Sequence, residues 1–303
     1  MKWVVALLLA SLLAGCASSD EPAVTPAPEP SQQPPATEEP PTTTPSNTSM
    51  APIFPIAYEQ RDCNAVVLIH AVDFATANGI LPLGYTAADM GYLMDLPANL
   101  NLAAIGLITY TCQDDDLGVG PHTQAALSVF IDAPVFNGTQ SSRDEVFLNV
   151  YEVHRFFTNE TQAARYAAAG WNVTTGLEAG VTTYIAPPAD LDQHQAPQPA
   201  SATTEGTLDG TQQWIGGVTG ATGFRLKHEN IRFWQETPGG VSLVEYSLNK
   251  HGRGGVSFCQ YAEDSLVAQT LGRTTCQPGE NVGLTVADFQ VTGTIEHFPG
   301  VYA

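Results

Sequence analysis

The sequence is poor in basic residues, and lysine is the scarcest of them. Its 303 residues include 11 Lys and Arg against 31 Asp and Glu, and the lysines are Lys2, Lys227 and Lys250 alone. The first 52 residues hold five of the acidic residues and one of the basic ones, so 26 acidic and 10 basic residues remain in the rest. A protein needs a basic surface to bind the phosphate backbone of a nucleic acid, so we expect no nucleic-acid partner. The acidic excess favours a monomer but leaves the oligomeric state open.

Motifs for nucleotide, metal and acyl-transfer chemistry are also missing. We find no P-loop, no G-x-G-x-x-G before a helix, no H-E-x-x-H and no G-x-S-x-G. No C-x-x-C or Cys/His cluster along the chain indicates zinc. Residues 114–116, three aspartates, lack the EF-hand spacing and predict a solvated turn rather than a calcium loop. We therefore expect neither a metal nor a cofactor.

The N-terminal apolar run, residues 3–13, is too short to cross a bilayer comfortably. Lys2 precedes it, and Leu-Ala-Gly-Cys at residues 13–16 follows it as a lipobox-like end. This pattern predicts a lipoprotein signal peptide over residues 1–16. A lipid on Cys16 would then anchor the exported chain to a membrane, and the chain would not span that membrane. The anchor would lie on the outer side of the cytoplasmic membrane or in the outer membrane. The alternative is an ordinary signal peptide in which Cys16 is incidental.

Residues 17–52 are rich in Pro, Thr, Ser and Glu and have almost no large apolar side chain. Such a segment cannot bury enough surface to offset the entropy lost on ordering. It predicts a disordered tether between the anchor and a folded part. Residues 53–303 then have a suitable length for one domain.

Four cysteines remain after Cys16, and an even number in an exported chain predicts disulfides. Four cysteines allow three pairings. We favour Cys63–Cys112 and Cys259–Cys276, because each closes a local loop, over four free buried thiols.

Short apolar or alternating segments separated by turns predict a mostly β fold, an antiparallel barrel or sandwich. Only one helix is convincing: Asn159 or Thr158 caps an Ala-rich run that Gly170 ends. Residues 74–79 predict a single helical turn that Asn78-Gly79 closes. Residues 190–204 predict a polar loop, and Gly216-Gly217 predicts a hairpin turn. The expected strands cover residues 64–74, 102–112, 124–132, 146–157, 171–185, 224–235, 241–250, 255–261 and 282–297.

Three segments resemble the acetoacetate decarboxylase superfamily, over about residues 66–175. "VVLIHAVDFATANGILPLGY" resembles the opening strand and turn of that family, and "LGVGPHTQAALSVFI" resembles its glycine loop and long strand. "NETQAARYAAAGWNVTTG" resembles the segment that carries the family's reactive lysine. The resemblance implies a barrel-like fold with a central apolar cavity and a lysine of lowered pKa that forms a Schiff base.

The residues at the matching functional positions differ from the family pattern. Residues 172–175 include no lysine, the family's acidic residue falls near Gln124, and its first-strand arginine falls near His70. Lys227 and Lys250 are expected on the surface rather than as displaced nucleophiles. The resemblance therefore implies a barrel that holds a small apolar or organic-acid ligand and does not decarboxylate it. Candidate ligand-binding residues are His70, Tyr110, Gln124, Tyr151, Arg165 and Trp171.

Each candidate also has a plainer interpretation. Arg165, which matches the family's G-R-E arginine, could pair with a ligand carboxylate or simply lie exposed on the helix. Trp171 and His70 could be core residues. Two other functions stay open. One is an exported hydrolase or lyase that uses His70 and Glu152 as an acid–base pair, and the other is a scaffold whose barrel is filled by its own side chains.

Overall fold

The computed structural model describes residues 55–93, 100–136, 139–140, 147–185, 200–220, 230–249, 252–276 and 281–299. The expected signal peptide (residues 1–16) and tether (17–52) lie outside these residues, as do Lys227 and Lys250. The part described falls within the unit Met50–Ala303. None of the helices found there is long and apolar enough to cross a membrane.

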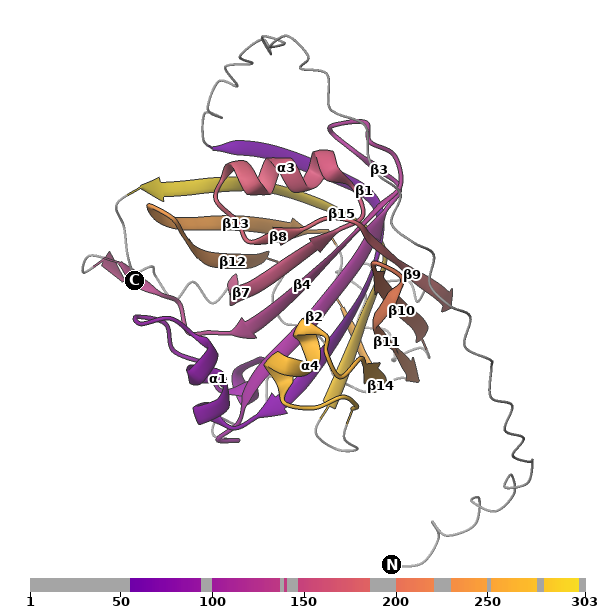
Figure 1. Ribbon diagram of the computed structural model, residues 1–303, viewed down its shortest axis with the longest axis horizontal. Coiled ribbons are helices and arrows are strands. Elements are labelled where there is room, and N and C mark those ends of the chain that lie inside the picture. The colour runs from indigo at the N-terminus through magenta and orange to yellow at the C-terminus, as the bar shows by residue number, and fades with distance from the viewer. Residues whose placement is uncertain are drawn as a thin grey trace, which may run out of the picture. The chain divides into compact units, whose positions relative to one another are not determined.

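A closed barrel of 7 strands forms the centre of the fold (Figure 1). The order around it is β1, β2, β4, β7, β12, β13, β15, and β15 pairs with β1 to close the ring. The expected mostly β barrel is confirmed. One seam differs from a purely antiparallel barrel, because β7 and β12 are parallel. The strands are β1 (Ile56–Val72), β2 (Ala103–Cys112), β4 (His122–Phe130), β7 (Phe147–Phe157), β12 (Asn230–Thr237), β13 (Gly240–Leu248) and β15 (Asn281–Pro299).

A second group of strands packs against the outside of the barrel wall. β9, β10, β11 and β14 pair in that order and contact β1, β2 and β4. β14 joins them to the barrel by pairing with the first part of β15. Their bounds, with those of the short strands, are β9 (Leu177–Ile185), β10 (Ala200–Leu208), β11 (Thr211–Gly220), β14 (Arg253–Tyr261), β3 (Asp114–Asp115), β5 (Val135–Phe136), β6 (Thr139–Gln140) and β8 (Val173–Thr174).

The expected helix is present as α3 (Glu160–Ala168), and Asn159 caps it by accepting from the backbone N–H groups of Thr161 and Gln162. α3 lies against the barrel (Figure 1) and contributes Ala163 and Tyr166 to its interior core. The helical turn expected at residues 74–79 is present as α1 (Phe74–Ile80). The structure adds two helices that the sequence did not predict, α2 (Met90–Leu93) and α4 (Leu266–Leu271).

Two local predictions in the outer strands were wrong. Residues 200–204 belong to strand β10 rather than to a polar loop, because Ala202 and Thr204 alternate inward against the second core. Gly216 and Gly217 lie inside β11 and make no turn. The hairpin turn is Asp209-Gly210, where both residues have positive φ.

The barrel wall separates two apolar cores. The first fills the barrel interior, and the second lies between the wall, the outer strands and the helices α1 and α4. Both favoured disulfides are present, Cys63–Cys112 and Cys259–Cys276.

Candidate functional site

The centre of the barrel holds an ion pair between Arg155 and Glu152, and neither side chain is exposed to solvent. The arginine Nε donates to both carboxylate oxygens at 2.9 and 3.0 Å, and Nη2 donates to Oε2 at 2.5 Å. Both residues come from β7. Residues three apart on a regular strand face opposite sides, but the β4–β7 register shifts between Leu127 and Ser128. This bulge turns both charges to the interior.

Polar side chains from four other elements, β2, β4, β13 and α3, complete a network around the ion pair. Arg155 Nη1 donates to Gln124 Oε1 at 3.3 Å and to the Tyr246 hydroxyl. Tyr110 donates to Gln124 Oε1 at 2.8 Å, and its oxygen lies 2.6 Å from that of Tyr246. Tyr166 of α3 lies 2.8 Å from the same Tyr246 oxygen. Every member of this network is buried, so the network is shielded from water.

Aromatic rings enclose the guanidinium of Arg155. Its Cζ lies 4.7 Å from the ring centre of Tyr166, 4.8 Å from Phe233, 5.5 Å from Tyr246 and 5.6 Å from Trp171. Ring faces attract a cation, so these contacts add to the ion pair. The site therefore holds the guanidinium of Arg155 between aromatic rings, and its counter-ion is the carboxylate of Glu152 from the same chain.

Burial dominates the acid–base behaviour of the network. It raises the pKa of Glu152, and Arg155 opposes that rise. Burial also raises the pKa of Tyr166 to about 12 and holds the pKa values of Tyr110 and Tyr246 well above their usual range. The tyrosines therefore stay neutral near pH 7 and act as hydrogen-bonding groups.

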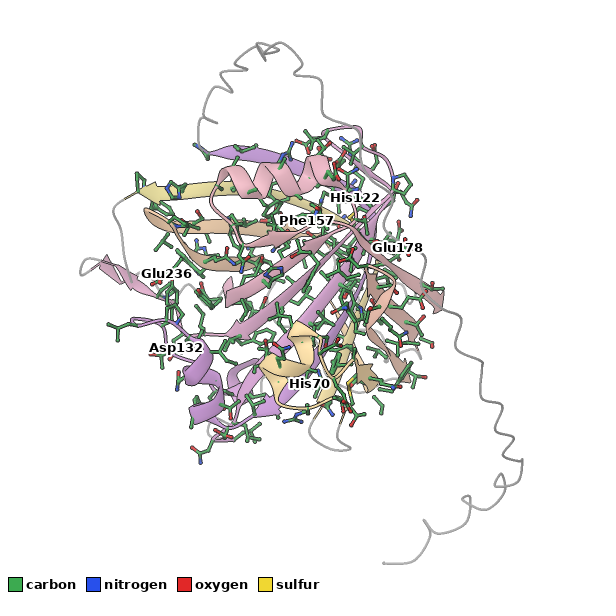
Figure 2. All side chains as sticks on the ribbon, in the orientation of Figure 1. His70, His122, Asp132, Phe157, Glu178 and Glu236 are labelled. Atoms are coloured by element: carbon green, nitrogen blue, oxygen red, sulfur yellow. A yellow bond between two sulfur atoms is a disulfide. The ribbon has the colours of Figure 1, made fainter. Side chains whose placement is uncertain are left out.

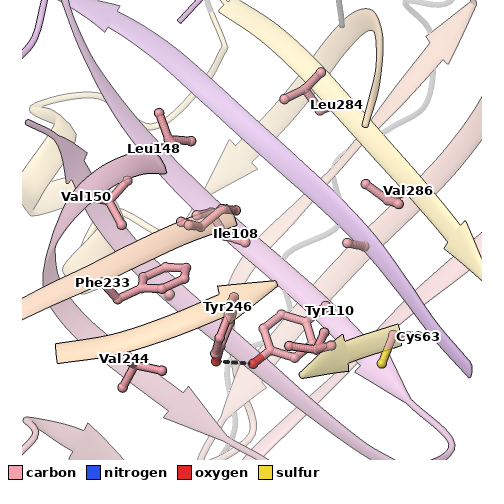
Figure 3. Packing of buried hydrophobic residues seen from close by; sticks show 14 of the residues in the cluster. Cys63, Ile108, Tyr110, Leu148, Val150, Phe233, Val244, Tyr246, Leu284 and Val286 are labelled. Atoms are coloured by element: carbon pink, nitrogen blue, oxygen red, sulfur yellow. Dashed lines mark hydrogen bonds between the residues drawn. The ribbon is translucent and has the colours of Figure 1, made fainter. Parts of the chain in front are cut away.

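An apolar hollow lies next to this network inside the barrel. It measures about 490 Å³ with its open mouth included, and about 40 Å³ of it admits water-sized molecules. Val67 and Leu248 in its wall are half-buried, so it reaches solvent there. Tyr110 and Tyr246 point toward one another among the wall residues Ile108, Phe233, Leu284 and Val286 (Figure 3). The full lining is Ala65, Val67, Ile108, Tyr110, Ile231, Phe233, Tyr246, Leu248, Gly252, Leu284, Val286, Phe289 and Val291.

Three of the six candidate residues lie at this site. Tyr110 and Gln124 belong to the network, and Trp171 packs beside Arg155. The Nε2 of Gln124 and the Nε1 of Trp171 are buried without a hydrogen-bond partner in the described part of the chain. Such groups are commonly satisfied by internal water.

The other three candidates lie elsewhere. His70 belongs to the far side of β1, where Nδ1 is 2.6 Å from Asn281 Oδ1 and Nε2 is 2.7 Å from the Tyr261 hydroxyl. Figure 2 shows His70 near α4, whereas Phe157, which packs on Tyr166, lies near α3. Burial lowers the pKa of His70 to about 4.

Tyr151 and Arg165 also lie away from the barrel interior. Tyr151 faces the second core and packs edge-on against Tyr85 with ring centres 4.9 Å apart. Arg165 pairs with Asp116 through two 3.0 Å hydrogen bonds beside α3. The structure also does not bring His70 to Glu152, since each has its own partners on opposite faces of the wall.

Sequence reasoning missed Arg155, Tyr166 and Tyr246 as members of the site. Alternation along β7 from Leu148 and Val150 puts Arg155 on the outside, and only the bulge reverses it. Tyr166 carried a usable signal, because it follows Gln162 and Ala163 on one face of a predicted helix.

The segment that resembles the lysine-bearing one lies beside the ion pair. Val173 of β8 pairs with Arg155 of β7, so residues 172–175 border the network. The three lysines of the sequence, at positions 2, 227 and 250, all fall outside the described residues.

Solved structures with the same architecture identify the fold. The acetoacetate decarboxylase-like enzyme of Sphingomonas wittichii RW1 matches with a TM-score of 0.51 at 13% identity, over 84% of this chain and 96% of the other. The acetoacetate decarboxylase of Legionella pneumophila matches with a TM-score of 0.50 at 10% identity, over 86% and 93%. This chain has the acetoacetate decarboxylase-like fold. The resemblance found in three short segments is thus confirmed for the fold.

A third solved structure also matches this chain over most of its length. The enduracididine biosynthesis enzyme MppR, in complex with the condensation product of pyruvate and imidazole 4-carboxaldehyde, aligns with a TM-score of 0.51 at 13% identity, over 85% of this chain and 93% of MppR. No family model and no curated protein matches the sequence. At these identities the likeness establishes the decarboxylase-like barrel and leaves its activity to the site.

Proposed function

We propose that this protein is an exported lipoprotein, anchored through a lipid on Cys16, whose decarboxylase-like barrel binds a small apolar molecule without a covalent bond. The observation that carries the ligand part is the apolar hollow that ends on Tyr110 and Tyr246. Small-molecule sites have mostly apolar walls and a few fixed polar groups. The lipobox-like end at Cys16 and the tether support the anchor.

The chemistry of the hollow favours an apolar ligand over an organic acid. Its lining includes no charged side chain among the described residues, and Glu152 already occupies the guanidinium of Arg155. A ligand carboxylate would lose its hydration without gaining a counter-charge. An apolar ligand would instead remove its own surface and that of the wall from water.

Paired ligands and matched variants test this proposal. Native mass spectrometry and thermal unfolding of the full chain would compare hexanol with hexanoate, which differ in their charge. We expect hexanol to bind and hexanoate to bind weakly. Val67→Phe fills the hollow and should abolish binding, whereas Val181→Phe, on a half-buried valine of the outer strand β9, should leave binding unchanged. Equal binding by both variants would contradict a site in the hollow.

A scaffold role is the second candidate, and one observation favours it. The space that admits water-sized molecules is only about 40 Å³, because the barrel is largely filled by its own side chains. A scaffold would carry no extra mass when purified from its host and would show no thermal shift with either hexanol or hexanoate.

A separate experiment tests the expectation that this chain forms no imine with a keto acid. MppR is also known in complex with pyruvate. Pyruvate with borohydride would leave a permanent adduct on any lysine that forms an imine. We expect no adduct on this chain, and an adduct on Lys227 or Lys250 would instead favour an enzyme. The anchor is tested by Cys16→Ser, which should move the protein out of the membrane fraction.

A further inference from the structure

A second cluster of chemically reactive side chains lies outside the barrel interior. His70 of β1, Cys259 of β14 and Cys276 after α4 place one ligand atom each within 4.8 Å of the others. The two sulfurs form a disulfide, and both cysteines are half-buried, whereas His70 is buried. The three residues are far apart in the sequence, so only the fold brings them together.

We propose that reduction of the Cys259–Cys276 disulfide converts this cluster into a Zn²⁺ site, with the two thiolates and the imidazole of His70 as ligands. A dithiol reductant supplies two electrons and two protons, which break the S–S bond and form two thiols, while the dithiol becomes a disulfide. Each thiol then releases one proton to solvent as its sulfur binds the metal. This proposal does not depend on what the barrel binds.

The geometry fits a tetrahedral metal after a small movement of the sulfurs. Zinc bonds sulfur at about 2.3 Å and imidazole nitrogen at about 2.0 Å, which sets ligand atoms roughly 3.5 to 3.8 Å apart. The ligand atoms of His70, Cys259 and Cys276 already lie within 4.8 Å of one another. After reduction, the two sulfurs need only move from S–S bonding distance to the separation that zinc sets. The backbones stay together, because Cys276 N–H donates to Cys259 O at 3.2 Å.

The surroundings orient the imidazole as a ligand. Asn281 Oδ1 accepts from Nδ1 at 2.6 Å, which leaves the Nε2 lone pair toward the Tyr261 hydroxyl at 2.7 Å. An oxygen partner on the other ring nitrogen is the usual way to orient a metal-bound histidine. Tyr261 or a water can supply the fourth ligand.

An arginine and a hollow lie near this cluster. Arg273 acts electrostatically on both His70 and Tyr261. Arg273 and Ala71, which follows His70, also line a hollow of about 290 Å³ at the barrel rim. The hollow borders the cluster at Ala71, and none of the three ligand residues lines it.

The other disulfide is a built-in control. Cys63 and Cys112 are completely buried, and they belong to no such ligand group among the described residues. Mild reduction should therefore reach the half-buried Cys259–Cys276 first. Among the described residues, no histidine forms a ligand group with Cys63 and Cys112 as His70 does with Cys259 and Cys276.

The experiment titrates Zn²⁺ and Co²⁺ into the full Cys16→Ser chain before and after reduction by a phosphine. We expect one Zn²⁺ per reduced chain, none per oxidised chain, and a thiolate charge-transfer band with Co²⁺. The double variant Cys63→Ala/Cys112→Ala should keep this binding, and Cys259→Ser/Cys276→Ser should lose it. His70→Gln should weaken binding by about tenfold or more.

X-ray absorption at the zinc edge keeps the test independent of folding defects. Two sulfurs and one histidine nitrogen around zinc in the reduced chain would support the proposal. No bound zinc after reduction, full affinity in His70→Gln, or a zinc shell without nitrogen would overturn it.

Discussion

Arg155 and Glu152 are a bidentate pair with no exposure to water, and each charge is stabilised in the interior by the other. Removing one partner of a buried pair leaves a charge without hydration or counter-ion. The surrounding tyrosines donate and accept but cannot neutralise a guanidinium. Single substitutions here should therefore have much larger effects than at exposed ion pairs.

The variant Glu152→Ala should destabilise the fold by about 3–5 kcal/mol, because it leaves Arg155 buried and unpaired. The matched control is Glu245→Ala, which breaks a 3.0 Å contact with Arg232 between partly exposed side chains and should cost under about 1 kcal/mol. Urea unfolding measures both. Formate should partly restore the first variant, and equal costs in the two variants would contradict a structural role for the pair.

Two buried histidines should make stability fall with acid. Burial lowers the pKa of His70 and of His154 from 6.5 to about 4. Between these values the unfolded chain binds protons that the folded chain does not, so stability is full above pH 6.5 and is lost as the pH falls toward 4. Each histidine should account for about 2 kcal/mol between pH 7 and pH 5.

Urea unfolding at pH 7 and pH 5 checks this expectation. His154→Gln should reduce the difference between the two pH values by the share of one histidine. An unchanged difference would show that His154 is charged in the folded protein.

Among the elements, helix α3 matters most for the site, because it brings Tyr166 against Tyr246 and Arg155. A helix of this length depends on its cap and its packed face. The bulge in β7 acts similarly at the level of a strand, since it turns Arg155 inward. Both features are local in the sequence, yet each brings a side chain into contact with residues that are distant in the sequence.

Asn159→Ala should cost about 1 kcal/mol, because it removes the side-chain oxygen that accepts from two N–H groups at the start of α3. Asn159→Asp should retain most of the stability. Asn172→Ala, at an exposed position in the following loop, is the control and should have little effect. Thermal unfolding measures all three, and a neutral Asn159→Ala would mean that packing alone holds the helix.

At the scale of the whole molecule, two long strands join the two cores. β1 and β15 pair along most of their length, and register shifts in β1 near Cys63 let the pair bend. β15 also pairs with β13 in the barrel and with β14 in the outer group. The disulfides tie these strands to β2 and to the segment after α4.

Removing the disulfides should cost stability in the order of their loop lengths. Cys63–Cys112 spans 49 residues and Cys259–Cys276 spans 17. Loop-closure entropy then gives about 4 kcal/mol for the first and about 3 kcal/mol for the second. Guanidinium unfolding of the two double Cys→Ala variants measures both. A larger loss for the shorter loop would mean that native contacts outweigh the entropy of the unfolded chain.

The sequence was enough to predict the mostly β barrel, helix α3 and the two disulfides, because each has a local signal. Alternating apolar residues, an Asn cap and short cysteine spacings act within a few residues or one loop. Tyr110 and Gln124, two of the proposed ligand-binding residues, face each other across the β2–β4 pair, and their binding of a ligand stays a prediction. The same local signals predicted a loop for the first part of β10. The small and polar residues of this strand do not show the apolar alternation that is typical of a strand with one buried face.

Only the tertiary structure decided which side chains meet. The bulge in β7 reverses the face of Arg155, and the closure of the barrel brings Tyr246 to Tyr110 from 136 residues away. The fold likewise carries His70 out of the barrel site and places it beside Cys259 and Cys276. These contacts depend on strand register and sheet closure, which are set by packing across the whole molecule and leave no mark on any single segment.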